Sequence, residues 1–151
     1  MKAKELMIGD WVECVDPTHK EKVYAQIDAI EEGQTCILVR LDNCNWFLDI
    51  SFIKPIPLIQ KILEKNGFNK IIPKKKFTKS LGDTSKFFKR CLVIELAQNR
   101  YKVSLKHEGM SDKITIRHIQ YVHELQHILL ALGMDADLKI PEKSDGKEAK
   151  P

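Results

Sequence analysis

The strongest constraint on the fold of this chain is a series of four short runs rich in β-branched and aromatic residues between Trp11 and Ile50. Turn-forming pairs separate the runs, namely Asp16-Pro17, Glu32-Gly33 and Asp42-Asn43. Short strands joined in this way are typical of an antiparallel meander that curls into a small barrel. The sequence therefore predicts an N-terminal SH3-like β-barrel of four or five strands, over residues 11–15, 23–30, 35–41 and 46–50.

A short helix is predicted directly after this barrel. The segment Lys54-Pro55-Ile56-Pro57-Leu58 ends the strand region, because a proline has no N–H to donate to a β-ladder. Apolar residues then recur at helical spacing up to Leu63. Gly67 can adopt the left-handed conformation that ends a helix, which would bring Phe68 back onto Leu63.

The rest of the chain predicts a hairpin and a long C-terminal helix. Residues 91–96 and 101–105 alternate as strands do around a turn at Gln98-Asn99, and residues 119–132 keep the apolar rhythm of an amphipathic helix ended by Gly133. The predicted fold class is therefore α+β. Its expected parts are a barrel lobe with the connecting helix at 1–68, a basic loop at 69–90, the hairpin and helix at 91–134 and a disordered tail at 135–151.

Charge is unevenly distributed along the 151 residues. Residues 1–68 hold 8 Lys or Arg against 11 Asp or Glu, residues 69–107 hold 11 against 2, and residues 108–151 hold 6 against 8. The middle of the chain is therefore strongly basic at +9, whereas the flanking parts are mildly acidic. An anionic partner, either a nucleic acid or an acidic protein, is expected to contact this middle segment.

Cysteine usage and hydropathy predict a cytoplasmic protein that does not span a membrane. The four cysteines form no C-x-x-C pair, no secretory leader is evident, and no run of about 18 apolar residues occurs. No P-loop, dinucleotide fingerprint or nucleophile elbow is present, so neither enzymatic activity nor a cofactor is expected.

Eight basic residues form the candidate binding segment, and three phenylalanines are interleaved with them. Lysines can neutralise phosphates while Phe77, Phe87 and Phe88 stack on unpaired bases. The alternative is a solvated lysine-rich loop that the phenylalanines anchor to the core. The basic residues are Lys70, Lys74, Lys75, Lys76, Lys79, Lys86, Lys89 and Arg90, and the hairpin's Arg100, Lys102 and Lys106 would widen the patch.

A second candidate site is the sequence His123-Glu124-Leu125-Gln126-His127, which matches the H-E-x-x-H pattern of zinc peptidases. In such enzymes both histidines bind the metal and the glutamate activates its water. A third protein ligand is required, and after His127 the chain offers only Asp135, Asp137, Glu142, Asp145 and Glu148. The pattern has only three fixed positions, so the alternative is an ordinary, partly exposed helix flank.

Three aromatic residues of the predicted barrel form the third candidate. Trp11, Trp46 and Phe47 would line a peptide groove if they were exposed, and would belong to the core if they were buried.

Four segments carry a resemblance to a known family. They are Lys4–Val12, Ile53–Leu58, Asn66–Phe68 and Tyr121–Gln126, in this order. Through them the chain, over about residues 4–133, resembles a family of small proteins with no known activity that is common in gut Bacteroidetes genomes and their prophages. The resemblance implies a shared fold. In that family the helix commonly reads Val-His-x-Leu-Gln-Asn, so His127 stands where an asparagine is usual.

These observations favour a non-enzymatic binding module that contacts nucleic acid or another polyanion through its basic segment. Two alternatives stay open: a zinc-dependent hydrolase that uses His123, Glu124 and His127, and a protein–protein interaction or accessory protein of a mobile element.

Overall fold

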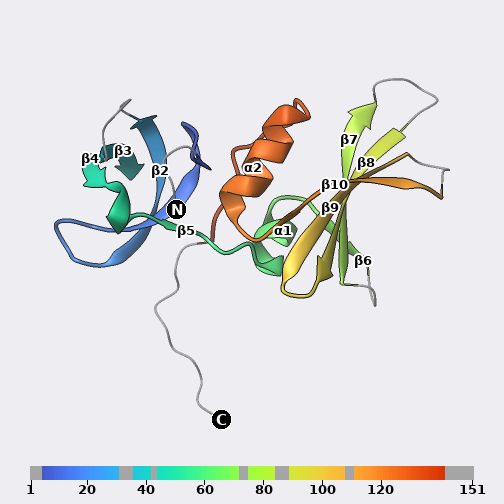
Figure 1. Ribbon diagram of the computed structural model, residues 1–151, viewed down its shortest axis with the longest axis horizontal. Helices are drawn as coiled ribbons and strands as arrows, with labels where there is room; N and C mark the ends of the chain where they lie inside the picture. Colours follow the sequence, from blue (N-terminus) through green and yellow to red (C-terminus); the bar gives the residue numbers. More distant parts are fainter. Residues whose placement is uncertain are drawn as a thin grey trace, which may run out of the picture.

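The computed structural model describes residues 5–30, 36–41, 44–71, 75–83, 89–107 and 111–141. Its strands form two antiparallel sheets, and helix α2 stands between them (Figure 1). The strands are β1 (Trp11–Val15), β2 (Lys22–Ile30), β3 (Cys36–Leu41), β4 (Cys44–Asp49), β5 (Lys54–Pro55), β6 (Asn69–Ile71), β7 (Lys76–Asp83), β8 (Lys89–Ala97), β9 (Arg100–His107) and β10 (Lys113–Ile119); the helices are α1 (Gln60–Lys65) and α2 (Val122–Ala131).

The first sheet has the strand order β4-β3-β2-β1-β5. β1 to β4 form a meander, and β5 returns to pair with β1, with Pro55 opposite Val12. A 3-10 helix at Ile50–Phe52 turns the chain toward β5, and Asp49 caps it by accepting a hydrogen bond from the Ser51 N–H at 2.8 Å. The sheet has its own core, formed by the buried residues Leu6, Val12, Cys14, Ala25, Ile27, Ile37, Val39 and Ile53.

The second sheet is a meander in the order β10-β9-β8-β7-β6. Gln98 and Asn99 join β8 to β9 with positive φ angles of 44° and 63°, as the twist of a two-residue hairpin requires. One face of this sheet carries Phe77, Leu92, Ile94, Tyr101 and Val103, and these side chains form the second core together with the buried sides of both helices. The opposite face carries charged residues and a central row in which Val93 and Ser104 are also buried.

Both helices end at a glycine, as the sequence predicts. Gly67 and Gly133 have φ angles of 76° and 68°, and the N–H groups of Phe68 and Met134 donate back to the carbonyls of Leu63 at 3.0 Å and Leu129 at 2.9 Å. α1 begins at Gln60, later than the prolines, because Pro57 forms an isolated bridge with Tyr121.

The predicted α+β fold class with a long C-terminal helix is wrong. Strands make up 53% of the described residues, so the chain is mostly β. α2 has only 10 residues, and Ile119, which fits the apolar rhythm of that helix, belongs to strand β10 instead. The reason is that β10 pairs with β9, which takes the chain as far as Ile119 into the second sheet.

The predicted basic loop at 69–90 is also wrong wherever the structure describes it as strand, at 69–71, 76–83 and 89–90. Lysines alternate with few apolar residues there, so the strand period is weak in the sequence, yet Phe77 is completely buried opposite Ile94. The expected disordered tail needs correction over 135–141, because Leu138 is buried in the second core and the Lys139 N–H donates to Asn66 Oδ1 at 2.7 Å. The expected disorder of 142–151 lies outside the described residues.

Candidate functional site

The strand register places basic side chains on one face of the second sheet. Neighbouring residues on a strand point to opposite faces, whereas residues paired directly across strands share a face. Phe77, Ile94 and Val103 pair in one row on the helix side. Two other rows therefore lie on the outer side of the sheet, which faces away from the helices. They are Lys76–Glu95–Lys102–His118 and Ser80–Cys91–Lys106–Lys113. We call the charged residues of this side the basic face: Lys76, Lys89, Glu95, Arg100, Lys102, Lys106, Lys113 and His118.

Glu95 lies at the centre of the basic face, and the register pairs a second acidic residue, Asp83, directly with Lys89. Glu95 contacts Lys113 through a short hydrogen bond and Lys76 at 3.8 Å. The hydrogen bond from Lys113 lowers the pKa of Glu95, and the charges of Lys113, Lys76 and Lys102 add to this effect. The lowered pKa reflects the positive potential at the centre of the face.

The eight predicted basic residues are not brought together. Lys76 and Lys89 lie on the basic face, but Lys70 is paired with Glu64 at 3.4 Å, and Lys79 donates to the Asn66 carbonyl at 2.9 Å while lying over the Phe68 ring. Lys75 lies in the turn before β7, and Arg90 pairs opposite His107 on the helix side. Lys74 and Lys86, like Phe87 and Phe88, lie outside the described residues. Phe77 belongs to the core, so it presents no ring for stacking.

Sequence reasoning missed Lys113 and His118 as members of this face. Both lie on β10, which the alternation at Ile114 and Ile116 suggests only weakly. Their position follows from pairing with Lys106 and Lys102 on β9. The usable signal in the sequence is the alternation of Arg100, Lys102 and Lys106 along β9, since every second residue of a strand shares a face.

The three aromatic residues that the sequence predicts to lie in a barrel do not form one surface of the first sheet. Trp11 packs against the second core, and its Nε1 is buried without a hydrogen-bond partner among the described residues. Trp46 packs against the core of the first sheet, whereas Phe47 is 65% exposed. Phe47 is therefore a surface residue, whereas each tryptophan packs against a core.

The H-E-x-x-H sequence lines a cleft of about 620 Å³ between α2 and the N-terminal segment, which we call the histidine cleft. Its lining residues are Glu5, Met7, Pro55, Arg117, Tyr121, His123, Glu124 and His127. Residues of the N-terminal segment and of α2, which are far apart in the sequence, thus line the same cleft.

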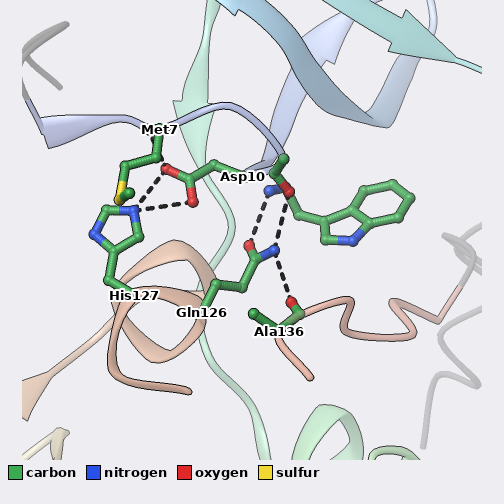
Figure 2. A network of polar contacts seen from close by, with 7 residues as sticks. Met7, Asp10, Gln126, His127 and Ala136 are labelled. Atoms are coloured by element: carbon green, nitrogen blue, oxygen red, sulfur yellow. Dashed lines mark hydrogen bonds and ion pairs between the residues drawn. The ribbon is translucent and has the colours of Figure 1, made fainter. Parts of the chain in front are cut away.

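His127 is held from the opposite side by Asp10. Its Nε2 lies 3.0 Å from Asp10 Oδ1 and 2.9 Å from Asp10 Oδ2, and the Met7 N–H donates to the same carboxylate at 2.7 Å (Figure 2). Asp10 is buried, so this carboxylate is a fixed partner of the imidazole. Sequence reasoning missed Asp10, because 117 residues separate it from His127 and no motif links them.

Glu124 serves as a structural cap of α2. Its Oε2 accepts hydrogen bonds from the backbone N–H groups of Gln120 at 2.7 Å and Tyr121 at 3.1 Å, and Oε1 accepts one from Arg117 at 3.2 Å. A glutamate at the third helical position commonly satisfies backbone donors in this way. Its carboxylate is therefore occupied, whereas a water-activating glutamate of a zinc site must face the metal.

His123 is a buried histidine with an unusual environment. Burial lowers its pKa, and its Nδ1 is buried without a hydrogen-bond partner among the described residues. Its ring stacks on Tyr121, with 5.9 Å between the centroids. The two histidine rings lie 5.8 Å apart, but in the described part of the chain no group of three or more His, Cys, Asp or Glu side chains is arranged to hold a metal ion. Of the third ligands considered, Asp135 and Asp137 are described, whereas Glu142, Asp145 and Glu148 are not.

Within the described residues, none of the helices has the length and apolar character needed to cross a membrane. Searches with family models, against curated proteins and against solved structures found no match to this chain.

Proposed function

We propose that this protein is a non-enzymatic module that binds nucleic acid through the basic face. The observation that carries the proposal is the strand register, which gathers six lysine and arginine residues on one side of the second sheet against two acidic residues, Glu95 and Asp83. Such a surface attracts a polyanion and gains affinity by releasing its counterions.

Duplex phosphates are the favoured target. The described part of the basic face has no aromatic side chain to stack on unpaired bases, since Phe77 points to the opposite side. Lysines contact phosphate oxygens, which position a protein on nucleic acid without reading its sequence. We therefore expect binding with little sequence preference.

The test is fluorescence anisotropy with a random-sequence 20-base-pair DNA duplex at 50 and 200 mM salt. A face that neutralises about four phosphates should lose about a hundredfold in affinity over this range. Charge reversal by Lys102→Glu and Lys106→Glu should weaken binding at 50 mM salt by about tenfold each. Lys61→Glu is the matched control, because Lys61 is an exposed lysine of α1, on the other side of the second sheet.

Two results would count against the proposal. Binding that Lys61→Glu weakens as much as Lys102→Glu would assign the effect to net charge alone. Absence of duplex binding together with salt-sensitive binding to poly-glutamate would assign the basic face to an acidic protein partner.

A further inference from the structure

Strand β10 forms one edge of the second sheet. Among the described strands it is bonded to β9 alone. Six of its seven residues, from Lys113 to His118, are exposed. A strand directs its N–H and C=O groups alternately to its two sides, so about half of the β10 backbone groups face away from β9. β10 therefore offers a row of backbone donors and acceptors to another extended chain.

The chain itself pairs with an extended segment directly after β10. Pro57 forms an antiparallel bridge with Tyr121, and the Leu58 N–H donates to the Gln120 carbonyl at 2.8 Å. This pairing involves residues beyond the end of β10, and it leaves the six residues before Ile119 exposed. The open part of the edge is therefore long enough to pair with a short strand.

The charges of β10 and of its neighbour favour an acidic partner. β9 and β10 together contain five Lys or Arg and no Asp or Glu. Two of these charges are offset from elsewhere, because Lys113 contacts Glu95 and Arg117 contacts Glu124. The lysine and arginine residues of β9 leave an excess of positive charge beside the edge, which attracts an acidic segment.

The same charges disfavour a second copy of this chain as the partner. Antiparallel pairing of β10 with another β10 about its centre would bring Lys113 close to Arg117 or His118 across the junction. Like charges directly opposite each other destabilise a pair of strands, whereas opposite charges stabilise it. The edge therefore discriminates against its own copy and accepts a strand that carries acidic residues.

The two sides of β10 require different side chains in a partner. Lys113 pairs with Lys106 on the outer side of the sheet, whereas Ile114 pairs with Leu105 on the helix side. Ile114 is 68% exposed, so an apolar residue placed across from it would cover surface that water now reaches. A strand in which acidic and apolar residues alternate matches both sides of the edge.

We propose that β10 binds an extended segment of a partner protein, in which acidic and apolar residues alternate, by adding it as a further strand to the second sheet. Backbone hydrogen bonds hold the segment, while its acidic residues lie beside Lys113 and its apolar residues beside Ile114. This proposal does not rest on nucleic-acid binding, because the backbone edge of β10 selects the segment.

The first test compares two labelled peptides of about eight residues by fluorescence anisotropy with the full chain at 50 mM salt. One peptide alternates glutamate and valine. The other has the same composition but places all glutamates before all valines, so it keeps the charge and loses the alternation. We expect the alternating peptide to bind at least about tenfold more tightly. Equal binding of the two peptides would show attraction by charge alone and would overturn the proposal.

A matched pair of substitutions locates the site. Ile114→Glu removes the apolar contact and adds a like charge, so it should weaken binding of the alternating peptide about tenfold. Ile8→Glu is the control, because Ile8 is 69% exposed in the segment before β1 and the change in net charge is the same. Equal weakening by both substitutions would place the peptide elsewhere and overturn the proposal.

Hydrogen exchange measured by NMR separates strand addition from attachment to lysine side chains. The alternating peptide should slow the exchange of alternate backbone amides between Lys113 and His118. Binding that leaves these amides unprotected would overturn the proposal. Protection that increases with protein concentration in the absence of peptide would assign the edge to a second copy of the chain, and would overturn it as well.

Discussion

The backbone N–H of Trp11 donates a hydrogen bond to Oε1 of Gln126 at 2.9 Å, across 115 residues of sequence. The amide nitrogen of the same side chain donates to the carbonyls of Gly9 at 3.0 Å and Ala136 at 3.1 Å. Gln126 thereby joins the first sheet, α2 and the segment after α2 (Figure 2). It is buried, and the four hydrogen-bonding positions of its amide are nearly all used.

Gln126→Ala should therefore be strongly destabilising. It leaves the Trp11 N–H and the carbonyls of Gly9 and Ala136 without their partner, and each unpaired buried group costs about 1–3 kcal/mol. Because water can reach part of this region, we expect a loss of about 3 kcal/mol in the free energy of unfolding, measured by urea denaturation. Gln26→Ala is the control: it removes one exposed hydrogen bond, to Asp137, and should cost less than about 1 kcal/mol. Equal losses in the two variants would contradict the joining role of Gln126.

Glu95→Gln should tighten duplex binding if the basic face is the interface. The substitution removes the carboxylate at the centre of the face and frees Lys76 and Lys113 from their ion pairs. We expect affinity in the anisotropy assay to rise about threefold at 50 mM salt, and the gain to shrink at 200 mM because salt screens surface charges. Glu64→Gln, at a residue of α1, is the matched control, because it frees Lys70 of β6 from its ion pair. A gain of the same size in this control would contradict the assignment.

The sequence predicted individual strands better than their assembly. The runs at 11–15 and 23–30 differ from β1 and β2 by at most one residue, because β-branched residues and turn pairs are local signals. β6 and β7 escaped prediction because lysines stand on both of their faces. Lys76 lies on the outer side, whereas Lys70 and Lys79 pair opposite core residues of the helix side, so polar and apolar residues do not alternate clearly. The basic face and the Asp10–His127 pair depend on register and on contacts between distant segments, which no local pattern encodes.

Two histidines should shift stability with pH in opposite directions. Burial lowers the pKa of His123 below its ordinary value of 6.5, so the unfolded chain binds the proton more readily there. The stability that neutral His123 provides is complete above pH 6.5 and is lost as the pH falls from there through the folded-state pKa. The hydrogen bond to Asp16 raises the pKa of His19, whose contribution is complete below pH 6.5 and is lost as the pH rises through its folded-state pKa.

Urea denaturation at pH 7.5 and 5.5 separates the two effects. His123→Phe keeps a ring against Tyr121 and should lose less stability than the wild type on acidification. His19→Asn should lose more than the wild type, because it lacks the opposing contribution of His19. An unchanged pH response in His123→Phe would contradict the account of His123.

Cys14 should be protected from thiol reagents in the folded protein. It lies on β1 in the core of the first sheet and is 1% exposed. Burial, with smaller contributions from Asp16 and Glu13, raises its pKa from 9.0 to about 11, so the reactive thiolate is about a hundredfold rarer at pH 8. We expect iodoacetamide to modify Cys14 at least about a hundredfold more slowly in buffer than in 8 M urea, with peptide mass spectrometry to identify the site. The half-buried Cys91 on β8 is the internal reference and should gain less from urea. Because the reagent reaches Cys14 only when the first sheet opens, a Cys14 rate in buffer equal to that in urea would contradict its burial.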